Sequence, residues 1–270
     1  MRLRNVWVCA LGVALAASAA ACGGGGEQSA TPGSAPGAPA GGGQRIDAAT
    51  AGTVSGTVAL DGMAPANEPI RMNADPVCVK ETKGPQLQET FVVGSDGKTL
   101  ANVFVYVKDG LGNYVYDAPT GSVTLDQKGC RYTPHVFGVR VNQPVQIVNS
   151  DPTLHNIHAT PKANKEFNNG QPIQGMKMEH KFTAKEVMVP FKCDVHGWMN
   201  AYVGVLDHPF FAVTKEDGKF ELKGVPPGTY TVEAWHQRLG TMTQSVIVGA
   251  SETKDVMFTF KAAGAPTATD

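Results

Sequence analysis

From residue 52 onward, apolar and polar residues alternate in short runs that end at glycine, proline, asparagine or aspartate. Alternation with a period of two indicates a strand with one buried face, whereas a helix repeats its apolar residues every three to four positions. We find no convincing helical repeat in this part of the chain. The runs that predict strands cover 53–60, 101–108, 136–141, 145–148, 187–193, 201–206, 219–222, 229–234, 245–248 and 256–260. The pattern therefore predicts an all-β fold of the kind found in sandwiches and barrels.

One stretch, 162–186, lacks this alternation and contains Asn168-Asn169-Gly170. We predict a loose loop there, and a loop of this length in a compact domain is often functional.

The first residues of the chain have the character of an export signal. Arg2 and Arg4 precede an apolar stretch over 6–17, which is too short for a comfortable membrane span. Small residues follow at 19–21. A positive start, a short apolar run and small residues before a cleavage point predict a signal peptide over 1–21.

Cys22 comes directly after the small residues and is followed by four glycines, which resembles the lipobox of bacterial lipoproteins. Ala19 stands where that motif usually has leucine. The resemblance implies that Cys22 is the lipidated first residue of the mature protein; ordinary secretion with cleavage nearby is the alternative. Residues 22–50 then form a lipidated, glycine-rich flexible linker. The chain is expected in the periplasm or at the cell surface, held to a bacterial membrane by this N-terminal lipid anchor.

Charge and composition exclude two broad classes of protein. The 270 residues carry 23 Lys+Arg against 24 Asp+Glu, a formal net charge of −1, which argues against a nucleic-acid partner. A hydrophobic fraction of 42% argues against a disordered chain. Apart from Trp7, all aromatic residues lie between Phe91 and Phe260, so the large core-forming side chains belong to the alternating part of the chain.

The five cysteines divide by context. An exported chain reaches an oxidising compartment, where disulfides persist. Cys9 lies inside the signal peptide and Cys22 is the candidate lipid site. Cys193 has metal-ligand neighbours, whereas Cys78 and Cys130 have none. We therefore predict a Cys78–Cys130 disulfide and a functional thiolate at Cys193.

Cys193, His196 and Met199 follow one another in steps of three between two predicted strands. A loop between strands can direct three side chains toward one point. A His₂Cys set with a long axial methionine is the arrangement of blue copper sites, although zinc could bind the same residues tetrahedrally. Such a set needs a second histidine, and His155, which follows another predicted strand, is the natural candidate.

The His-Asn-Ile-His run at 155–158 and the short Cys-x2-His-x2-Met loop together resemble the cupredoxins, above all the amicyanin and plastocyanin group. The resemblance covers roughly 100–207. It implies a Greek-key β-sandwich with one type 1 copper. A binuclear copper centre would need two cysteines in the loop, and a copper nitrite reductase would need two such domains. The resemblance assigns three equatorial ligands and one axial ligand: His155, Cys193, His196 and, axially, Met199.

The same resemblance implies roles for the neighbours of the ligands. Asn156 would brace the ligand loops, and His158 would lie just outside the ligand set or at the surface. Trp198, between two ligands, would shield the copper or contact a partner.

Four further histidines lack ligand partners at useful spacing. We interpret them as structural, packing or surface residues: His135, His180, His208 and His236.

A second resemblance lies in 214–234, which is similar to the carboxypeptidase regulatory-like domain, a transthyretin-like β-sandwich. Asp217-Gly218 fits a tight hairpin and Pro227-Gly228 a second turn. That family usually begins with a strand like 54–62, which here lies far upstream. The copper-binding part is therefore inserted into this sandwich or packed continuously on it; two consecutive domains with a boundary near 208 are the alternative.

These observations divide the chain into six parts. They are a signal peptide at 1–21, a linker at 22–50, N-terminal strands of the regulatory-like sandwich at 51–98, a cupredoxin-like copper domain at 99–207, the rest of the regulatory-like sandwich at 208–262 and a tail at 263–270.

The function that the sequence predicts is one-electron transfer by a mononuclear copper protein, without enzymatic activity. Its partner would be a respiratory or dehydrogenase complex at the membrane. Two alternatives stay open: a protein of copper storage, delivery or sensing, and a structural β-sandwich with an incidental copper site.

Overall fold

The computed structural model describes residues 42–82 and 84–262. In this part the regular structure consists of strands and one short helix, so the predicted all-β class is confirmed. The predicted signal peptide, Cys22, most of the linker and the C-terminal tail lie outside the described residues.

Seven strands form one β-sandwich, here called the host sandwich. They are β1 (Gly52–Asp61), β4 (Phe104–Asp109), β14 (Phe211–Val213), β15 (Lys219–Val225), β16 (Gly228–His236), β17 (Gly240–Val248) and β18 (Thr253–Lys261). One sheet has the order β15-β1-β18 and the other β14-β4-β16-β17. The alternation along β1 follows from its place, because Val54, Gly56 and Val58 are buried, whereas Ser55 and Thr57 between them are only partly buried.

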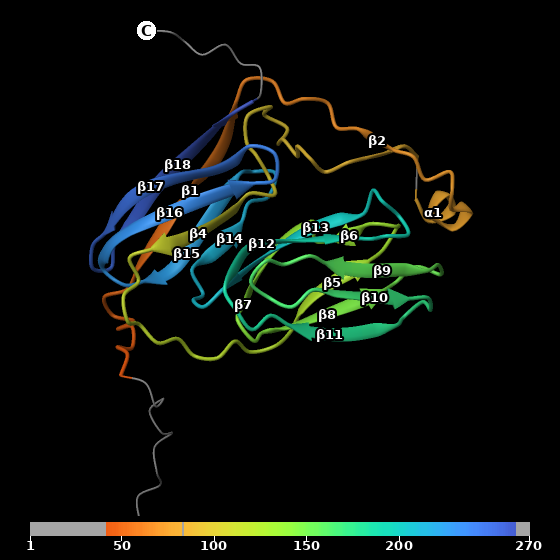
Figure 1. Cartoon of the computed structure of the whole chain (residues 1–270). Helices are drawn as coiled ribbons and strands as arrows, with labels where there is room; N and C mark the ends of the chain where they lie inside the picture. The colour runs from red at the N-terminus through yellow and green to blue at the C-terminus, as the bar shows by residue number, and fades with distance from the viewer. Residues whose placement is uncertain (1–41, 83, 263–270) are drawn as a thin grey trace, which may run out of the picture. The chain divides into compact units, whose positions relative to one another are not determined.

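Nine strands form a second sandwich, here called the inserted sandwich. They are β5 (Val123–Gln127), β6 (Tyr132–Thr133), β7 (Val136–Arg140), β8 (Pro144–Asn149), β9 (His155–Ala159), β10 (Phe167–Gln171), β11 (Lys177–Lys181), β12 (Glu186–Lys192) and β13 (Asn200–Leu206). Its sheets, drawn in Figure 1, have the orders β10-β9-β12-β13-β7 and β11-β8-β5-β6. Both sheets contribute to one apolar core.

The connection between the two sandwiches is an insertion. β4 pairs with β14 and β16 of the host sandwich, and all of β5 to β13 lies between β4 and β14 along the chain. The boundary that we placed at residue 99 therefore precedes a strand of the host sandwich. A strand pattern by itself does not reveal this, because it does not say which partner a strand takes.

β4 is buried on both of its faces. Val105 and Val107 enter the host core, whereas Phe104 and Tyr106 enter a separate cluster that includes Val136 of the inserted sandwich. Both sandwiches contribute to this cluster.

The cluster requires a glycine on the inserted sandwich. A Cβ atom at Gly204 would lie 2.3 Å from Cζ of Phe104, closer than real contacts allow. The absent side chain on β13 therefore admits the Phe104 ring.

The stretch 162–186 is more regular than we predicted, because it contains β10 and β11. β10 pairs with β9 and β11 pairs with β8, each as the edge strand of its sheet. Edge strands can be largely polar, since little of their surface enters the core. That explains why the apolar alternation was missing here.

The chain leaves the host sandwich after β1 and returns to it at 98–100, which bond to β1 just before β4 begins. Within this excursion lie β2 (Pro69–Ile70), α1 (Pro76–Glu81) and β3 (Gln86–Leu87). We call its described residues between 62 and 99 the cover segment, since it packs on the inserted sandwich; it is drawn in orange to yellow in Figure 1.

The predicted disulfide between Cys78 and Cys130 is confirmed, and it ties the cover segment to the inserted sandwich. Cys78 lies in α1, a helix that the sequence pattern did not predict. Asp75 caps this helix and Pro76 occupies its first turn, which is a recognised start signal. Six residues are too few to show a helical repeat, so the periodicity missed it.

Candidate metal centre

Two neighbouring strands bring the candidate ligands together. His155 is the first residue of β9, and Cys193 directly follows β12. β9 and β12 are antiparallel neighbours, with Lys192 opposite His158. The start of one strand and the end of the other therefore lie at the same edge of the sheet. His196 follows in the loop from β12 to β13.

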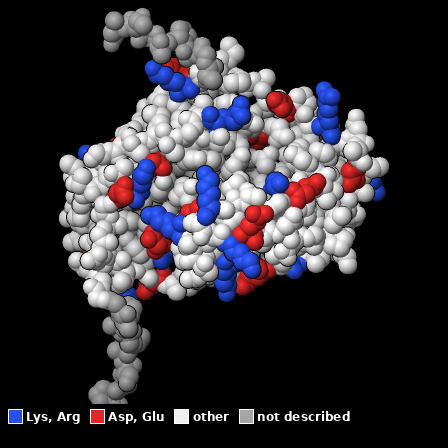
Figure 2. Space-filling view, in the orientation of Figure 1, with Lys and Arg blue, Asp and Glu red and all other residues white. Residues whose placement is uncertain are grey.

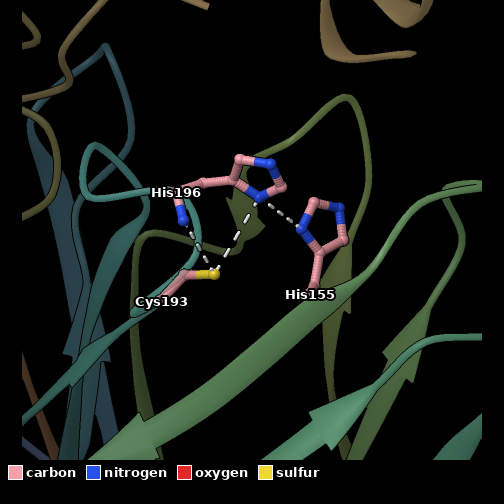
Figure 3. A group of neighbouring side chains, drawn as sticks. All are labelled: His155, Cys193 and His196. Carbon is pink, nitrogen blue, oxygen red and sulfur yellow. Dashed lines mark hydrogen bonds between the residues drawn. The ribbon is translucent and has the colours of Figure 1, made fainter. Parts of the chain in front are cut away.

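Three side chains converge at this edge, as Figure 3 shows. Nδ1 of His155 lies 3.0 Å from Nδ1 of His196, and Sγ of Cys193 lies 4.0 Å from the latter nitrogen. One donor atom from each of the three residues lies within 4.8 Å of the other two. The side chains are enclosed, with 0%, 2% and 3% of His155, Cys193 and His196 exposed. Two imidazole nitrogens and a thiol that face one another in an enclosed place fit a copper or zinc ion.

Met199 closes the loop that carries the ligands. Its backbone N–H donates to the carbonyl of His196 at 2.8 Å, and its carbonyl accepts from the N–H of Cys193 at 3.2 Å. The side chain is buried, with 2% exposed, and packs in the core of the inserted sandwich. Its role as axial ligand belongs to the function proposed below.

Asn156 links the two segments that carry the ligands. Its Oδ1 accepts from the backbone N–H of Asp194 at 2.7 Å and lies 3.2 Å from the thiol of Cys193. Its Nδ2 donates to Oδ1 of Asn168 at 2.7 Å. These bonds join β9 to the ligand loop, which is the arrangement expected of a brace. They also give the polar β10 a part in positioning that loop.

His158 and Trp198 lie beside the centre. His158 forms ion pairs with Asp194 and Glu166, each at 2.9 Å, on the partly exposed side of β9. The ring of Trp198 packs against His196 with centroids 5.0 Å apart, and its Nε1 donates to the carbonyl of Cys130 at 3.0 Å. Trp198 therefore covers the candidate ligand His196 and hydrogen-bonds to the backbone of the disulfide-bonded Cys130.

Two aspartates at the centre were not among our predicted site residues. Oδ2 of Asp151 lies 2.9 Å from Nε2 of His155, and Oδ2 of Asp75 lies 2.9 Å from Nε2 of His196. Asp151 stands four residues before His155, so the local sequence carried a signal for it. Asp75 is 121 residues from His196 in sequence, and no local pattern could have indicated it.

Burial and the neighbouring charges shift the pKa values of His155, Cys193 and His196. Burial alone would lower the pKa of His155, but Asp151 and the Cys193 thiolate together raise it to about 8. Burial alone would raise the pKa of Cys193, but hydrogen bonding with His155 and with backbone N–H groups lowers it. Burial lowers the pKa of His196, although Asp75 opposes this. A thiol whose pKa is lowered more readily supplies the thiolate that binds a metal.

The four histidines that we interpreted as structural lie elsewhere. His135 packs edge-on against Tyr202, and His180 stacks on Phe167 with centroids 3.9 Å apart. His208 and His236 are buried at the host sandwich. In the described part of the chain, none of the four belongs to a cluster that could hold a metal ion.

One family model matches part of the chain. Residues 182–256 match the model described as polysaccharide lyase family 4, domain II, a span that runs from the inserted into the host sandwich. The similarity of 214–234 to the carboxypeptidase regulatory-like domain stays a prediction. Among curated proteins, none matches the chain.

Several solved structures are similar to about a third of the chain. A copper-containing nitrite reductase from Thermus scotoductus is 19% identical over 35% of this chain and 24% of its own, with a TM-score of 0.31. An amicyanin variant with Cu(I) is 20% identical over 33% of this chain and 86% of its own, at 0.29. A purple cupredoxin from Nitrosopumilus maritimus is 22% identical over 31% of this chain and 98% of its own, at 0.27. The chain thus spans about a quarter of the nitrite reductase.

Proposed function

We propose that this protein is an exported, membrane-tethered carrier of single electrons with one type 1 copper ion. The observation that carries the proposal is the convergence of three enclosed donors, Nδ1 of His155, Nδ1 of His196 and Sγ of Cys193. Met199 would be the axial ligand. Bound there, copper would supply the exchange between Cu(I) and Cu(II).

The residues around the site support transfer of electrons rather than exchange of the metal. His155 is the first residue of a strand inside a sheet, and Asn156 holds the loop that carries Cys193. Donors held in this way move little between two oxidation states. Enclosure by the cover segment and Trp198 opposes release of a bound ion, so storage or delivery is the less favoured function.

The proposed place in the cell rests on the N-terminal sequence. Within residues 42–82 and 84–262, no helix is long and apolar enough to cross a membrane. A signal peptide and a lipid on Cys22 would supply the tether. The partner would be a respiratory or dehydrogenase complex at the same membrane.

The mixed surface charge suits a partner whose own surface is not dominated by charge of one sign. On the face seen in Figure 2, Lys and Arg side chains are interspersed with Asp and Glu side chains. The full chain has a formal net charge of −1, and loss of Arg2 and Arg4 with the signal peptide would make it −1 − 2 = −3; this small charge argues for a partner that is neither strongly acidic nor strongly basic.

The test is to add Cu(II) to the purified mature chain and to record its visible spectrum, its electron paramagnetic resonance and its voltammetry. We expect an intense thiolate-to-copper band and reversible cycling. Cys193→Ser and His155→Gln should abolish the band, whereas His180→Gln, a matched change outside the cluster, should leave it intact. Unchanged copper affinity and spectrum in Cys193→Ser would refute the ligand assignment. A colourless site that exchanges its copper readily would indicate delivery instead.

A further inference from the structure

Each histidine of the candidate centre has a carboxylate on its far side. Nδ1 of His155 and of His196 face one another, and Nε2 of each lies 2.9 Å from an oxygen of Asp151 or Asp75 respectively. An ionised carboxylate only accepts hydrogen bonds, so each Nε2 carries the proton. In the neutral ring the lone pair is then on Nδ1, which faces the other histidine and lies near Cys193, where a metal ion would bind it. Such pairs orient metal-binding histidines and make them more basic.

Asp151 is held firmly by its surroundings. Oδ1 accepts from the backbone N–H of Gly129 at 2.8 Å, and Oδ2 accepts from the N–H of Cys130 at 2.7 Å. Its own N–H donates to Oδ1 of Asn149 at 3.0 Å. Only 2% of the residue is exposed. The position of this carboxylate therefore depends on the turn that contains Cys130.

Asp75 comes from the cover segment and not from either sandwich. Oδ1 caps α1 by accepting from the N–H groups of Val77 at 2.8 Å and Cys78 at 3.3 Å. Oδ2 faces His196 and also accepts from the hydroxyl of Thr153 at 3.0 Å. A helix of six residues is not stable alone, so α1 needs another attachment to hold this carboxylate in place.

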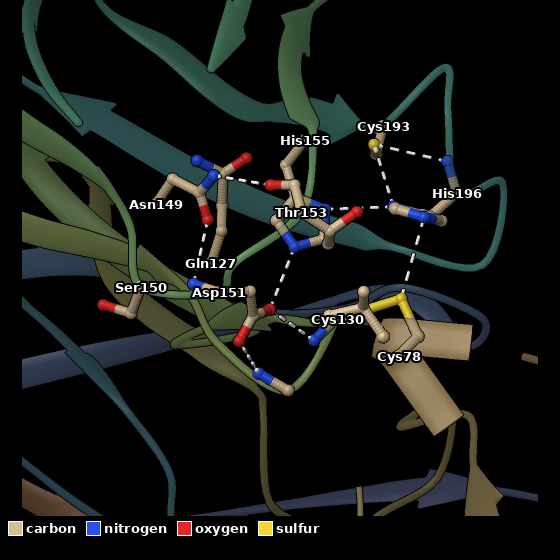
Figure 4. A network of polar contacts seen from close by, with 12 residues as sticks. Cys78, Gln127, Cys130, Asn149, Ser150, Asp151, Thr153, His155, Cys193 and His196 are labelled. Atoms are coloured by element: carbon tan, nitrogen blue, oxygen red, sulfur yellow. Dashed lines mark hydrogen bonds and ion pairs between the residues drawn. A yellow bond between two sulfur atoms is a disulfide. The ribbon is translucent and has the colours of Figure 1, made fainter. Parts of the chain in front are cut away.

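The disulfide is that attachment. Cys78 lies three residues after Asp75, and Cys130 donates its N–H to Asp151. One covalent bond therefore joins the segment that bears the first carboxylate to the turn that holds the second. Both cysteines are fully buried, and Sγ of Cys78 lies 3.7 Å from Nε2 of His196 (Figure 4).

We propose that Asp75, Asp151 and the disulfide form a clamp that positions both imidazoles of the metal centre, with the disulfide acting through the carboxylates. None of the three is a ligand; they are positioning groups. The inference deepens the function proposed above and rests on it for its copper readouts. Loss of the clamp should weaken copper binding and raise the reduction potential, because removing a negative charge beside the site favours Cu(I) over Cu(II).

Asp75→Asn is the sharpest single test. The amide oxygen can still cap α1, whereas the NH₂ group replaces the oxygen that accepts from His196. We expect a loss of copper(II) affinity of about 10- to 100-fold, together with a raised potential. Asp96→Asn is the matched control, since Asp96 also accepts backbone N–H groups, from Lys98 and Thr99, outside the clamp. Affinity and potential unchanged in Asp75→Asn would overturn the proposal.

A double-mutant cycle tests whether the disulfide acts through the carboxylate. Cys78→Ser with Cys130→Ser should reduce copper affinity by a factor similar to that of Asp75→Asn. Combining all three changes should cost little more than the larger single effect. If the fold-losses in copper affinity from the two changes multiplied, the disulfide would act independently of Asp75, and the clamp would be refuted.

A readout without metal separates failure of the clamp from failure of the proposed function. Nitrogen-15 spectra of the metal-free protein, recorded above pH 8 where His155 is neutral, report which ring nitrogen of each histidine carries the proton. We expect Nε2–H for both His155 and His196, with only His196 changed in Asp75→Asn. A wild-type chain that binds no copper but shows these tautomers would refute the function and keep the clamp. Nδ1–H in either histidine would refute the clamp, even if the disulfide variant failed to fold.

Discussion

Two buried histidines of the host sandwich should make the protein unstable in mild acid. His208 and His236 are 2% and 1% exposed. Nδ1 of His208 accepts the N–H of Phe210 at 3.2 Å, and Nδ1 of His236 accepts those of Arg238 and Leu239, each at 3.3 Å. Protonation would turn Nδ1 into a hydrogen-bond donor that faces these backbone N–H donors. It would also place a charged imidazolium ring in an apolar environment.

Burial lowers the pKa of each of these two imidazoles to about 4. The unfolded chain, with a histidine pKa near 6.5, therefore binds protons at a higher pH than the folded chain does. The contribution of these two histidines to the free energy of unfolding is fully present above pH 6.5 and is lost as the pH falls toward 4. Linkage gives a loss of about 2 kcal/mol per histidine between pH 7 and pH 5, or about 4 kcal/mol for the pair.

Asp75, Asp151 and His155 at the centre act in different ranges of pH, whereas burial also lowers the pKa values of His196, His135 and His180, which act in the same direction as His208 and His236. The pKa values of Asp75 and Asp151 are lowered, so their contribution is lost only as the pH falls below about 3.9. The pKa of His155 is raised to about 8, so its contribution is present below 6.5 and is lost as the pH rises through 8. Neither effect imitates a loss between pH 7 and pH 5.

The assay is urea unfolding of the metal-free chain at pH 7, 6 and 5, followed by circular dichroism. His208→Asn and His236→Asn each retain an acceptor near the position of Nδ1 but cannot be protonated. Each should lose about 2 kcal/mol less than the wild type between pH 7 and pH 5. His158→Asn serves as the control, because ion pairing with Glu166 and Asp194 raises the pKa of His158. If the asparagine variants were as acid-sensitive as the wild type, the argument from buried neutral histidines would be refuted.

Two further substitutions test the packing and polar contacts of the core. Gly204→Ala should cost about 1–3 kcal/mol of unfolding free energy, because its Cβ would meet the Phe104 ring; Gly170→Ala, whose nearest neighbour lies 4.0 Å away, should change it by about 0.5 kcal/mol or less. Equal effects of the two alanines in urea unfolding would contradict the close approach. Tyr106→Phe removes the hydroxyl that donates to the buried Glu233 carboxylate at 2.5 Å and should cost about 1.5–3 kcal/mol. An unchanged unfolding midpoint would show that this hydrogen bond contributes nothing.

Local patterns predicted the strands that carry an apolar face, and they failed where the chemistry was not local. β1 and β15 alternate because one face enters a core, so the period of two was visible in the sequence. β10 and β11 were missed because edge strands bury little apolar surface. α1 was missed because its stability comes from a cap and a disulfide and not from an apolar repeat.

The candidate ligands were easier to identify from the sequence than the groups that hold them. Cys193, His196 and Met199 share one loop, so their spacing alone indicates a common site. Asp75 reaches His196 only because a helix from a distant excursion is bound across the end of the inserted sandwich. No pattern of residue spacing along the chain relates two residues that lie so far apart in sequence.

The sequence by itself determined the all-β class, the pairing of Cys78 with Cys130 and the residue types that can bind a soft metal, since each depends on composition or on local order. Only the tertiary structure decided that β4 belongs to the host sandwich and that the Asp75 carboxylate contacts His196 from behind. Strand partners and buried polar contacts are chosen by packing between distant segments. The free energy of these contacts arises only between segments, so no single segment carries a sequence pattern that predicts them.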